Sequence, residues 1–223
     1  MFAPINPTGY AEHISGLEVL FCDEHMLAVH KPSGLLSTPG RGEHLHDSVV
    51  SRIQTQYPDA TAVHRLDMYT SGVMVLARGI YATRTLGLAF EKRLVHKIYQ
   101  AWAWSIPPEL QGQIDLPLIC DWPNRPRQIV DFQRGKTTTT LYKVLEADSS
   151  ANRSKWELTP LTGRSHQLRV HLSHIGHPIL GDPLYAHPPA LTCATRLMLH
   201  SCKIQIPHPQ THKIMQFSSP APF

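Results

Sequence analysis

A strongly apolar strand attached to a charged turn is the feature that most constrains this chain. Residues 73–77 form a continuous apolar run, Val-Met-Val-Leu-Ala, which predicts a fully buried central strand. They follow directly on His64–Gly72 (HRLDMYTSG), in which Asp67 lies between basic residues and a turn-forming Thr-Ser-Gly. A carboxylate in a loop fixed to a core strand is held rigidly yet can reach a ligand, as a catalytic acid must. The alternative is an Asp67 that only caps its own turn, and this segment alone leaves both open.

A second segment, Thr162–His171 (TGRSHQLRVH), predicts a helix. Ser165 is the expected N-cap and Gly176 the expected C-terminal cap. An apolar stripe recurs at helical spacing between them: Leu168, Leu172 and Ile175. Arg169 lies beside this stripe, at the edge of the predicted buried face, where a stranded charge would cost several kcal/mol. We therefore expect Arg169 either to pair with an acid or to lay its stem over apolar surface with its head in water.

Taken together, the two segments resemble the most specific motifs of the RluA-type pseudouridine synthases, HRLDxxTSG and GRSHQLRVH. Lys31-Pro32-Ser33-Gly34 resembles the family's N-K-P-x-G segment, although His30 replaces the usual Asn, and Lys97-Ile98-Tyr99 resembles its K-x-Y strand. Residues 120–126 (CDWPNRP) look like a stretch of the branch with dual specificity for 23S rRNA and tRNA. The resemblance runs from about residue 17 to the C-terminus.

The hydrophobic patterns predict an α+β protein. Helices are expected over Ser48–Tyr57, with Asp47 as cap, and over Ile80–Arg93. Strands are expected at residues 17–21, 26–31, 97–104, 137–146, 155–161, 204–207 and 213–218, and residues 107–126 read as irregular. The resemblance implies the pseudouridine synthase fold: a mixed, largely antiparallel, bifurcated sheet with flanking helices and a central active-site cleft. It also implies an N-terminal arm (1–16), a single catalytic domain (17–223) and no S4 domain.

The resemblance implies isomerisation of uridine to pseudouridine in structured RNA, with the target base flipped into a pocket. Asp67 would be the catalytic carboxylate, attacking sugar or base or removing a ribose proton; these three stay open. Arg169 would pair with Asp67 and favour its ionised form. Tyr99 would stack on the uracil, and its hydroxyl is a candidate proton relay at C5. Considered without the family, strand propensity alone favours a half-buried strand aromatic at Tyr99, and the position after Lys97 in the family pattern is what points to the catalytic role.

Contacts to RNA are expected around these residues. The resemblance suggests that Arg65 enters the stack where the base has left. His64 would contact phosphate or a backbone carbonyl. Trp122 would be a stacking platform or would close a proline-rich loop. Five basic residues are candidate phosphate ligands: Lys31, Arg41, Arg125, Arg127 and Arg164.

Composition limits other functions. A net charge of +4 permits RNA binding without establishing it, and four scattered cysteines without a signal peptide predict a cytoplasmic protein in a reducing compartment. Nucleotide-binding motifs and a serine-hydrolase motif are missing from the sequence, so we expect no cofactor. The histidines at 166, 171, 174 and 177 have no supporting metal pattern, so we expect no metal. A monomer without membrane contact is the default.

Two alternatives of other classes stay open. A base-cleaving glycosylase would normally need a second carboxylate beside Asp67, and the motif holds only basic neighbours. A purely RNA-binding module would have no use for Asp67, Tyr99 and Arg169 together. Detection of free uracil would support the first alternative.

Overall fold

The computed structural model describes residues 12–42 and 45–223. The chain forms two compact units. Unit 1 consists of Met1–Lys97 and Ser201–Pro222, and unit 2 of Ile98–His200 and Phe223. The described helices are too short or too polar to cross a membrane.

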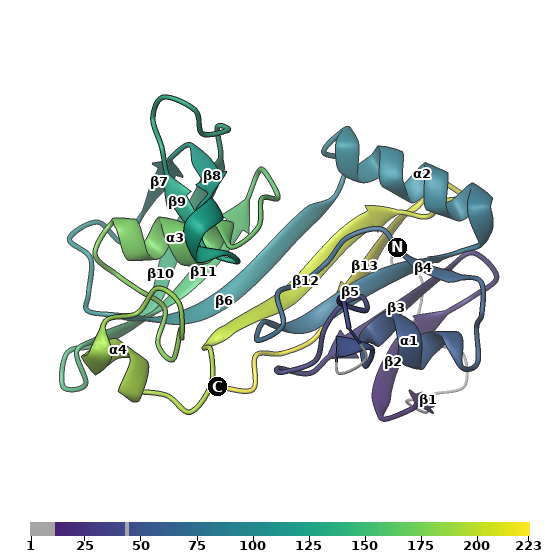
Figure 1. Cartoon of the computed structure of the whole chain (residues 1–223), viewed down its shortest axis with the longest axis horizontal. Coiled ribbons are helices and arrows are strands. Elements are labelled where there is room, and N and C mark those ends of the chain that lie inside the picture. The colour runs from purple at the N-terminus through teal and green to yellow at the C-terminus, as the bar shows by residue number, and fades with distance from the viewer. Residues whose placement is uncertain (1–11, 43–44) are drawn as a thin grey trace. The chain divides into compact units, whose positions relative to one another are not determined.

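Unit 1 is built on a sheet in the order β1-β2-β3-β5-β12, with β13 paired to β12 and β4 to β5 (Figure 1). Its strands are β1 (Glu12–Ile14), β2 (Leu17–Cys22), β3 (Met26–Lys31), β4 (Ala60–Ala62), β5 (Ser71–Arg78), β12 (Leu199–Pro207) and β13 (Ile214–Ser218). The pairs β1–β2, β2–β3, β3–β5, β4–β5 and β12–β13 are antiparallel. Part of the predicted N-terminal arm is therefore a strand; residues 1–11 lie outside the described part.

Strand β5 is the predicted buried strand, and residues 71–77 are all buried. Helix α2 (Gly79–Glu91) follows it at once and packs against it through Ala82, Leu86 and Ala89. Together with apolar residues of β3, β12 and β13, they form the core of this unit. Because β5 is buried in that core, the loop that precedes it starts from a fixed point.

Unit 2 contains an antiparallel sheet in the order β6-β11-β10-β7. Its strands are β6 (His96–Trp104), β7 (Gln111–Asp115), β10 (Thr139–Asp148) and β11 (Arg153–Pro160). A separate two-stranded hairpin, β8 (Leu118–Cys120) and β9 (Gln128–Val130), carries the 3-10 turn η2 (Trp122–Asn124) at its tip. Two helices complete the unit: α3 (Gln167–His174) and α4 (Pro188–Thr192).

The predicted α+β class with largely antiparallel strands is confirmed. The irregular reading of residues 107–126 is wrong, because this stretch contains β7 and β8. Its prolines fall outside both strands, so they interrupt the hydrophobic pattern without breaking a ladder.

Two predicted helix caps are also wrong. Helix α1 (Val49–Gln54) is capped by Ser48 in a reciprocal capping box with Ser51, while Asp47 pairs with Arg52 at 2.7 Å. Each serine hydroxyl oxygen accepts the backbone N–H of the other serine, so the box satisfies two N–H groups at the start of the helix, whereas both Asp47 carboxylate oxygens accept from Arg52.

Helix α3 begins one residue later than Ser165 predicts. His166 is its N-cap, in the left-handed conformation with φ 55°. At the other end Gly176, with φ 85°, is the C-terminal cap as expected. The amide of His177 donates to Leu172 O and that of Gly176 to Ser173 O, which is a Schellman motif. Of the predicted stripe, Leu168 and Leu172 are buried but Ile175 is exposed.

Candidate active site

Hydrogen bonds hold the backbone on both sides of Asp67 against the end of β3 and the segment that follows it. The Met68 carbonyl accepts from the Gly34 amide at 2.9 Å and from Lys31 Nζ at 2.9 Å. The Ser37 hydroxyl donates to Leu66 O at 2.6 Å and accepts from Leu66 N at 3.0 Å. Asp67 itself is only partly buried, and its carbonyl accepts from the Thr70 amide. The carboxylate is thus carried on a loop fixed at both neighbours, as catalysis requires.

Lys31 has a structural position within unit 1. Its side chain is fully buried, and its ammonium donates to the carbonyls of Pro32 (2.9 Å), Leu35 (2.6 Å) and Met68 (2.9 Å). A buried ammonium needs such compensation because leaving water is costly. The expectation that Lys31 contacts phosphate does not agree with this position. The residue instead ties the loop after β3 to the Asp67 loop.

His64 also faces inward. Its Nε2 accepts from the Val75 amide at 2.9 Å, and its ring stacks on Phe90 at a centroid distance of 4.9 Å. Burial, together with the charge of Lys97, lowers the pKa of His64 to about 3. The neutral ring serves a backbone N–H, which neither expected role for His64 included. Arg65 and Arg41 are both exposed, as RNA contacts require.

Gly72 closes the motif for a steric reason. Its φ is +117°, which side chains rarely adopt, and an added Cβ would lie 2.3 Å from the Ser201 carbonyl oxygen. Only glycine lets β5 approach β12 this closely. The motif's final residue is therefore explained by packing within unit 1.

In unit 2, Arg169 is fully enclosed and held by an acid. Its Nε and Nη2 each donate to an Asp182 carboxylate oxygen at 2.7 Å, and the two side chains are 2% and 0% exposed. Asp182 also accepts from the amides of Leu184 and Tyr185, so the acceptor is itself fixed. Arg169 lies deeper than the boundary position predicted for it. A guanidinium carries five N–H donors, and the bidentate contact with Asp182 engages two of them.

Tyr185 connects this ion pair to neighbouring elements. The guanidinium carbons of Arg169 and Arg127 lie 5.1 Å and 5.3 Å from its ring centroid. Its hydroxyl accepts from the Gln128 amide at 2.8 Å and bonds to His166 Nδ1 at 2.7 Å. Burial raises the pKa of Tyr185 to about 12. Neither Asp182 nor Tyr185 was among the residues predicted from the sequence to act with Arg169. The turn sequence Gly181-Asp182-Pro183 was the available signal, because Asp before Pro favours a turn.

The remaining predicted site residues of unit 2 lie on a strand, in a loop and in the hairpin. Tyr99 lies on β6 opposite Leu158 and is 9% exposed. Arg164 is exposed in the loop before α3, and its amide donates to Gln167 Oε1. Arg125 lies over the Trp122 ring at 4.7 Å, in the hairpin formed by β8 and β9.

Two of the four clustered histidines, His171 in α3 and His177 after it, contact hydroxyl groups of the protein. His171 Nε2 lies 2.7 Å from the Thr138 hydroxyl, and burial lowers the pKa of His171 to about 4. His177 Nδ1 lies 2.7 Å from the Ser105 hydroxyl. Within residues 12–42 and 45–223, no three His, Cys, Asp or Glu side chains gather in a metal-binding arrangement.

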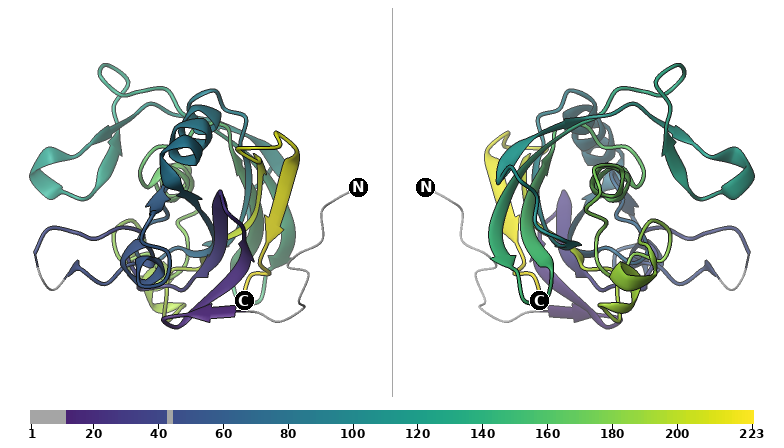
Figure 2. Two further views of the ribbon diagram at one scale, coloured as in Figure 1. Left: turned by 90° about the vertical axis from the view of Figure 1, so that its right-hand side faces the viewer. Right: turned by 90° about the vertical axis from the view of Figure 1, so that its left-hand side faces the viewer.

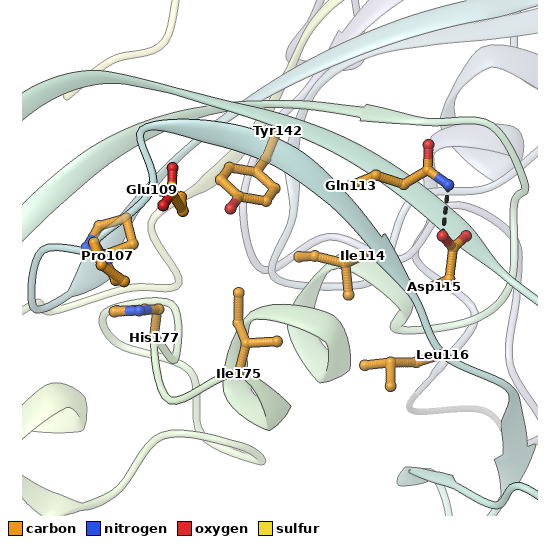
Figure 3. A pocket seen from close by; sticks show the side chains of 10 residues that line it. Pro107, Glu109, Gln113, Ile114, Asp115, Leu116, Tyr142, Ile175 and His177 are labelled. Atoms are coloured by element: carbon orange, nitrogen blue, oxygen red, sulfur yellow. Dashed lines mark hydrogen bonds between the residues drawn. The ribbon is translucent and has the colours of Figure 1, made fainter.

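A cavity of about 380 Å³ lies beside β7 in the same unit (Figure 3). Tyr142, Ile175 and His177 face it together with residues of the segment before and along β7. Asp115 at its edge accepts from Thr139 and Gln113, and these hydrogen bonds lower the pKa of Asp115. None of the predicted catalytic residues lines this cavity.

Comparison with known proteins decides the family. Residues 25–174 match the sequence model of the RNA pseudouridylate synthase family. The chain belongs to this family. It is 51% identical to the "Dual-specificity RNA pseudouridine synthase RluA" of Escherichia coli (strain K12), over 93% of this chain and 94% of that protein. It is 49% identical to the protein of that name from Vibrio parahaemolyticus, over 92% of this chain and 84% of the relative.

Solved structures agree. Human RNA Pseudouridylate Synthase Domain Containing 1 matches with a TM-score of 0.78 and 27% identity, over 96% of this chain and 86% of that chain. Human RNA Pseudouridylate Synthase Domain Containing 4 shares the fold, with a TM-score of 0.74 and 24% identity, over 92% and 88% of the two chains. The chain is therefore an RNA pseudouridine synthase, an isomerase whose substrate is uridine in RNA.

Proposed function

We propose that Asp67 is the catalytic carboxylate of this synthase, and that Arg169 and Tyr99 act with it on a flipped uridine. The observation that carries this proposal is the fixation of the Asp67 loop by Lys31, Gly34 and Ser37. Chemistry on an extruded base needs a group held within a fraction of an ångström. A turn-capping Asp would need no such support on both of its neighbours.

The reaction sets the tasks of these residues. The C1′–N1 bond breaks, the uracil turns while bound, and a C1′–C5 bond forms; C5 then loses its proton and N1 gains one. Asp67 would attack the sugar or the base or remove a ribose proton. Tyr99 would stack on the uracil, and its hydroxyl would relay the C5 proton. Tyr99→Phe should therefore keep stacking and lose the relay.

Arg169 would orient Asp67 and hold it ionised, since a nearby guanidinium favours a carboxylate's charged form. Its bidentate contact with Asp182 supports this role because the fork cannot rotate while both nitrogens are engaged. Five of the predicted RNA-contacting residues are exposed, which supports RNA contacts by them: Arg41, Arg65, Arg125, Arg127 and Arg164. Lys31 and His64 would act by shaping the Asp67 loop.

The substrates would be uridines in 23S rRNA and in the anticodon stem-loop of tRNA, modified by one monomeric, cytoplasmic catalytic domain. The name of the relatives, dual-specificity RNA pseudouridine synthase, supports two substrates. An enzyme that reads a short unpaired loop can accept two RNAs that share that loop. A synthase of single specificity is the alternative.

The test is pseudouridine mapping in cells that lack this protein and regain it. Loss of one site in 23S rRNA and one in tRNA, restored by the wild type but not by Asp67→Asn, is the expected result. Loss in one RNA alone would establish single specificity. Restoration of both sites by Asp67→Asn would refute the catalytic role of Asp67.

A further inference from the structure

The hairpin from Leu118 to Val130 presents an aromatic ring and a cation to solvent. Trp122 in η2 is 65% exposed, although tryptophan is usually highly buried. The Arg125 guanidinium lies 4.7 Å from its ring centroid. Figure 2 shows the hairpin, in teal, extending away from the four-stranded sheet of its own unit. Trp122 therefore contributes little to a core and offers a face to a ligand.

The charge of the hairpin favours an anionic partner. Arg125 and Arg127 are both exposed, and among the described residues neither guanidinium has a carboxylate within 4.0 Å. The one acid of the hairpin, Asp121, accepts from the side-chain amide of Asn124 at 3.0 Å. A cationic surface with an exposed aromatic ring fits single-stranded nucleic acid, which stacks bases on aromatics and arginines and places phosphates beside cations.

The base of the hairpin is joined to the Arg169 region. The Gln128 amide donates to the Tyr185 hydroxyl, and Arg127 lies over the Tyr185 ring, as Arg169 does. Strand β9 also packs against α3, the helix that carries Arg169. A nucleotide bound at Trp122 would therefore lie on an element that is fastened to Arg169.

We propose that Trp122 and Arg125 form a stacking site for an unpaired nucleotide of the substrate RNA, separate from the nucleotide that is isomerised. This proposal rests on the proposed function, because the nucleotide belongs to the same RNA. The ring of Trp122 takes a base on its face, and Arg125 keeps that ring flat against the hairpin and faces the adjoining phosphate. The site recognises an unpaired base without selecting its identity, since every base has a π face.

The test measures binding of a short RNA stem-loop with an unpaired, uridine-containing loop, in the full chain. Trp122→Ala should weaken RNA binding by about 5- to 150-fold, the range of one lost base stack. Trp122→Phe should retain most of the affinity because a ring remains. In turnover, Trp122→Ala should raise KM and leave kcat nearly unchanged, since stacking away from the reacting base stabilises ground and transition states alike.

Phe132 provides the matched control. It is 74% exposed in the turn that follows the hairpin, and no guanidinium lies over its ring in the described part of the chain. Phe132→Ala should change RNA affinity by less than about twofold. An equal loss in Phe132→Ala and Trp122→Ala would show a general apolar effect and overturn the site.

Fluorescence gives a second readout. Of the four tryptophans, Trp102 and Trp156 are buried and Trp104 is partly buried, so RNA stacking should quench the emission of Trp122. The quench should vanish in Trp122→Phe. RNA that binds Trp122→Ala as tightly as wild type, without quenching the wild type, would refute the stacking site. Failure of wild-type protein to convert uridine at all would instead refute the proposed function.

Discussion

Replacing Lys31 with methionine tests the support of the Asp67 loop most sharply. Methionine has a similar length and no donor, so the change removes the ammonium and keeps most of the packing. Three carbonyl oxygens, that of Leu35 in a buried contact and those of Pro32 and Met68 in partly buried ones, then lose this donor. Met68 O keeps the Gly34 amide, whereas the other two lose their ammonium contact.

The size of the effect follows from these contacts. A buried acceptor that loses its donor costs about 1–3 kcal/mol, so two carbonyls give about 2–6 kcal/mol. The variant no longer buries a charged ammonium, and this gain offsets part of the lost stability. We expect a net loss of about 2–4 kcal/mol in the free energy of unfolding of Lys31→Met. Because Met68 directly follows Asp67, kcat should fall as well, at temperatures where the variant is fully folded.

Urea unfolding and single-turnover conversion of an RNA stem-loop measure the two effects. The matched control is Lys136→Met, an exposed lysine whose loss should change stability by less than about 0.5 kcal/mol. If Lys31→Met unfolded like this control and converted uridine at the wild-type rate, the reasoning about the loop would be wrong.

Three further predictions concern other parts of the chain. Gly72→Ala should lower the free energy of unfolding by at least about 3 kcal/mol, through its positive φ and a backbone clash, whereas Gly87→Ala on the open face of α2 should raise it by about 0.5–1 kcal/mol; urea unfolding of both variants checks this. The pKa values of His64 and His171 are about 3 and about 4 in the folded protein, below the unfolded value of 6.5. The unfolded state therefore binds more protons as pH falls below about 6.5, stability should fall with it, and His64→Gln should flatten that slope in pH-dependent unfolding. Arg169→Met strands a buried carboxylate and should cost about 3–5 kcal/mol in the same assay, with Arg169→Lys losing less.

The sequence predicted elements where one physical pattern dominates. Strand β5 was predicted by its apolar run, and Gly176 by its position after a helical stripe, because each depends on neighbours in sequence. The cap at His166 was missed, since a left-handed histidine gives no local signal. β7 was missed because its sequence, QGQID, carries little apolar alternation and is stabilised by pairing with β10.

For the site residues too, the sequence predicted what depends on a local motif and missed what depends on the fold. Arg169 was singled out from its place in the motif, but its partner Asp182, thirteen positions later, could not be chosen from sequence because side-chain pairing depends on the fold. Lys31 was grouped with exposed cations because composition cannot distinguish a buried ammonium from a solvated one. The roles of Asp67 and Tyr99 stay predictions.

The central claim, that Asp67 performs chemistry at a uridine, is tested most directly by tritium release from RNA labelled at C5 of uracil. Formation of the C1′–C5 bond expels that hydrogen, so the wild type should release one tritium for each pseudouridine formed, with no free uracil. Asp67→Asn should bind the same RNA with similar affinity and release none. Release at the wild-type rate by Asp67→Asn would contradict the account.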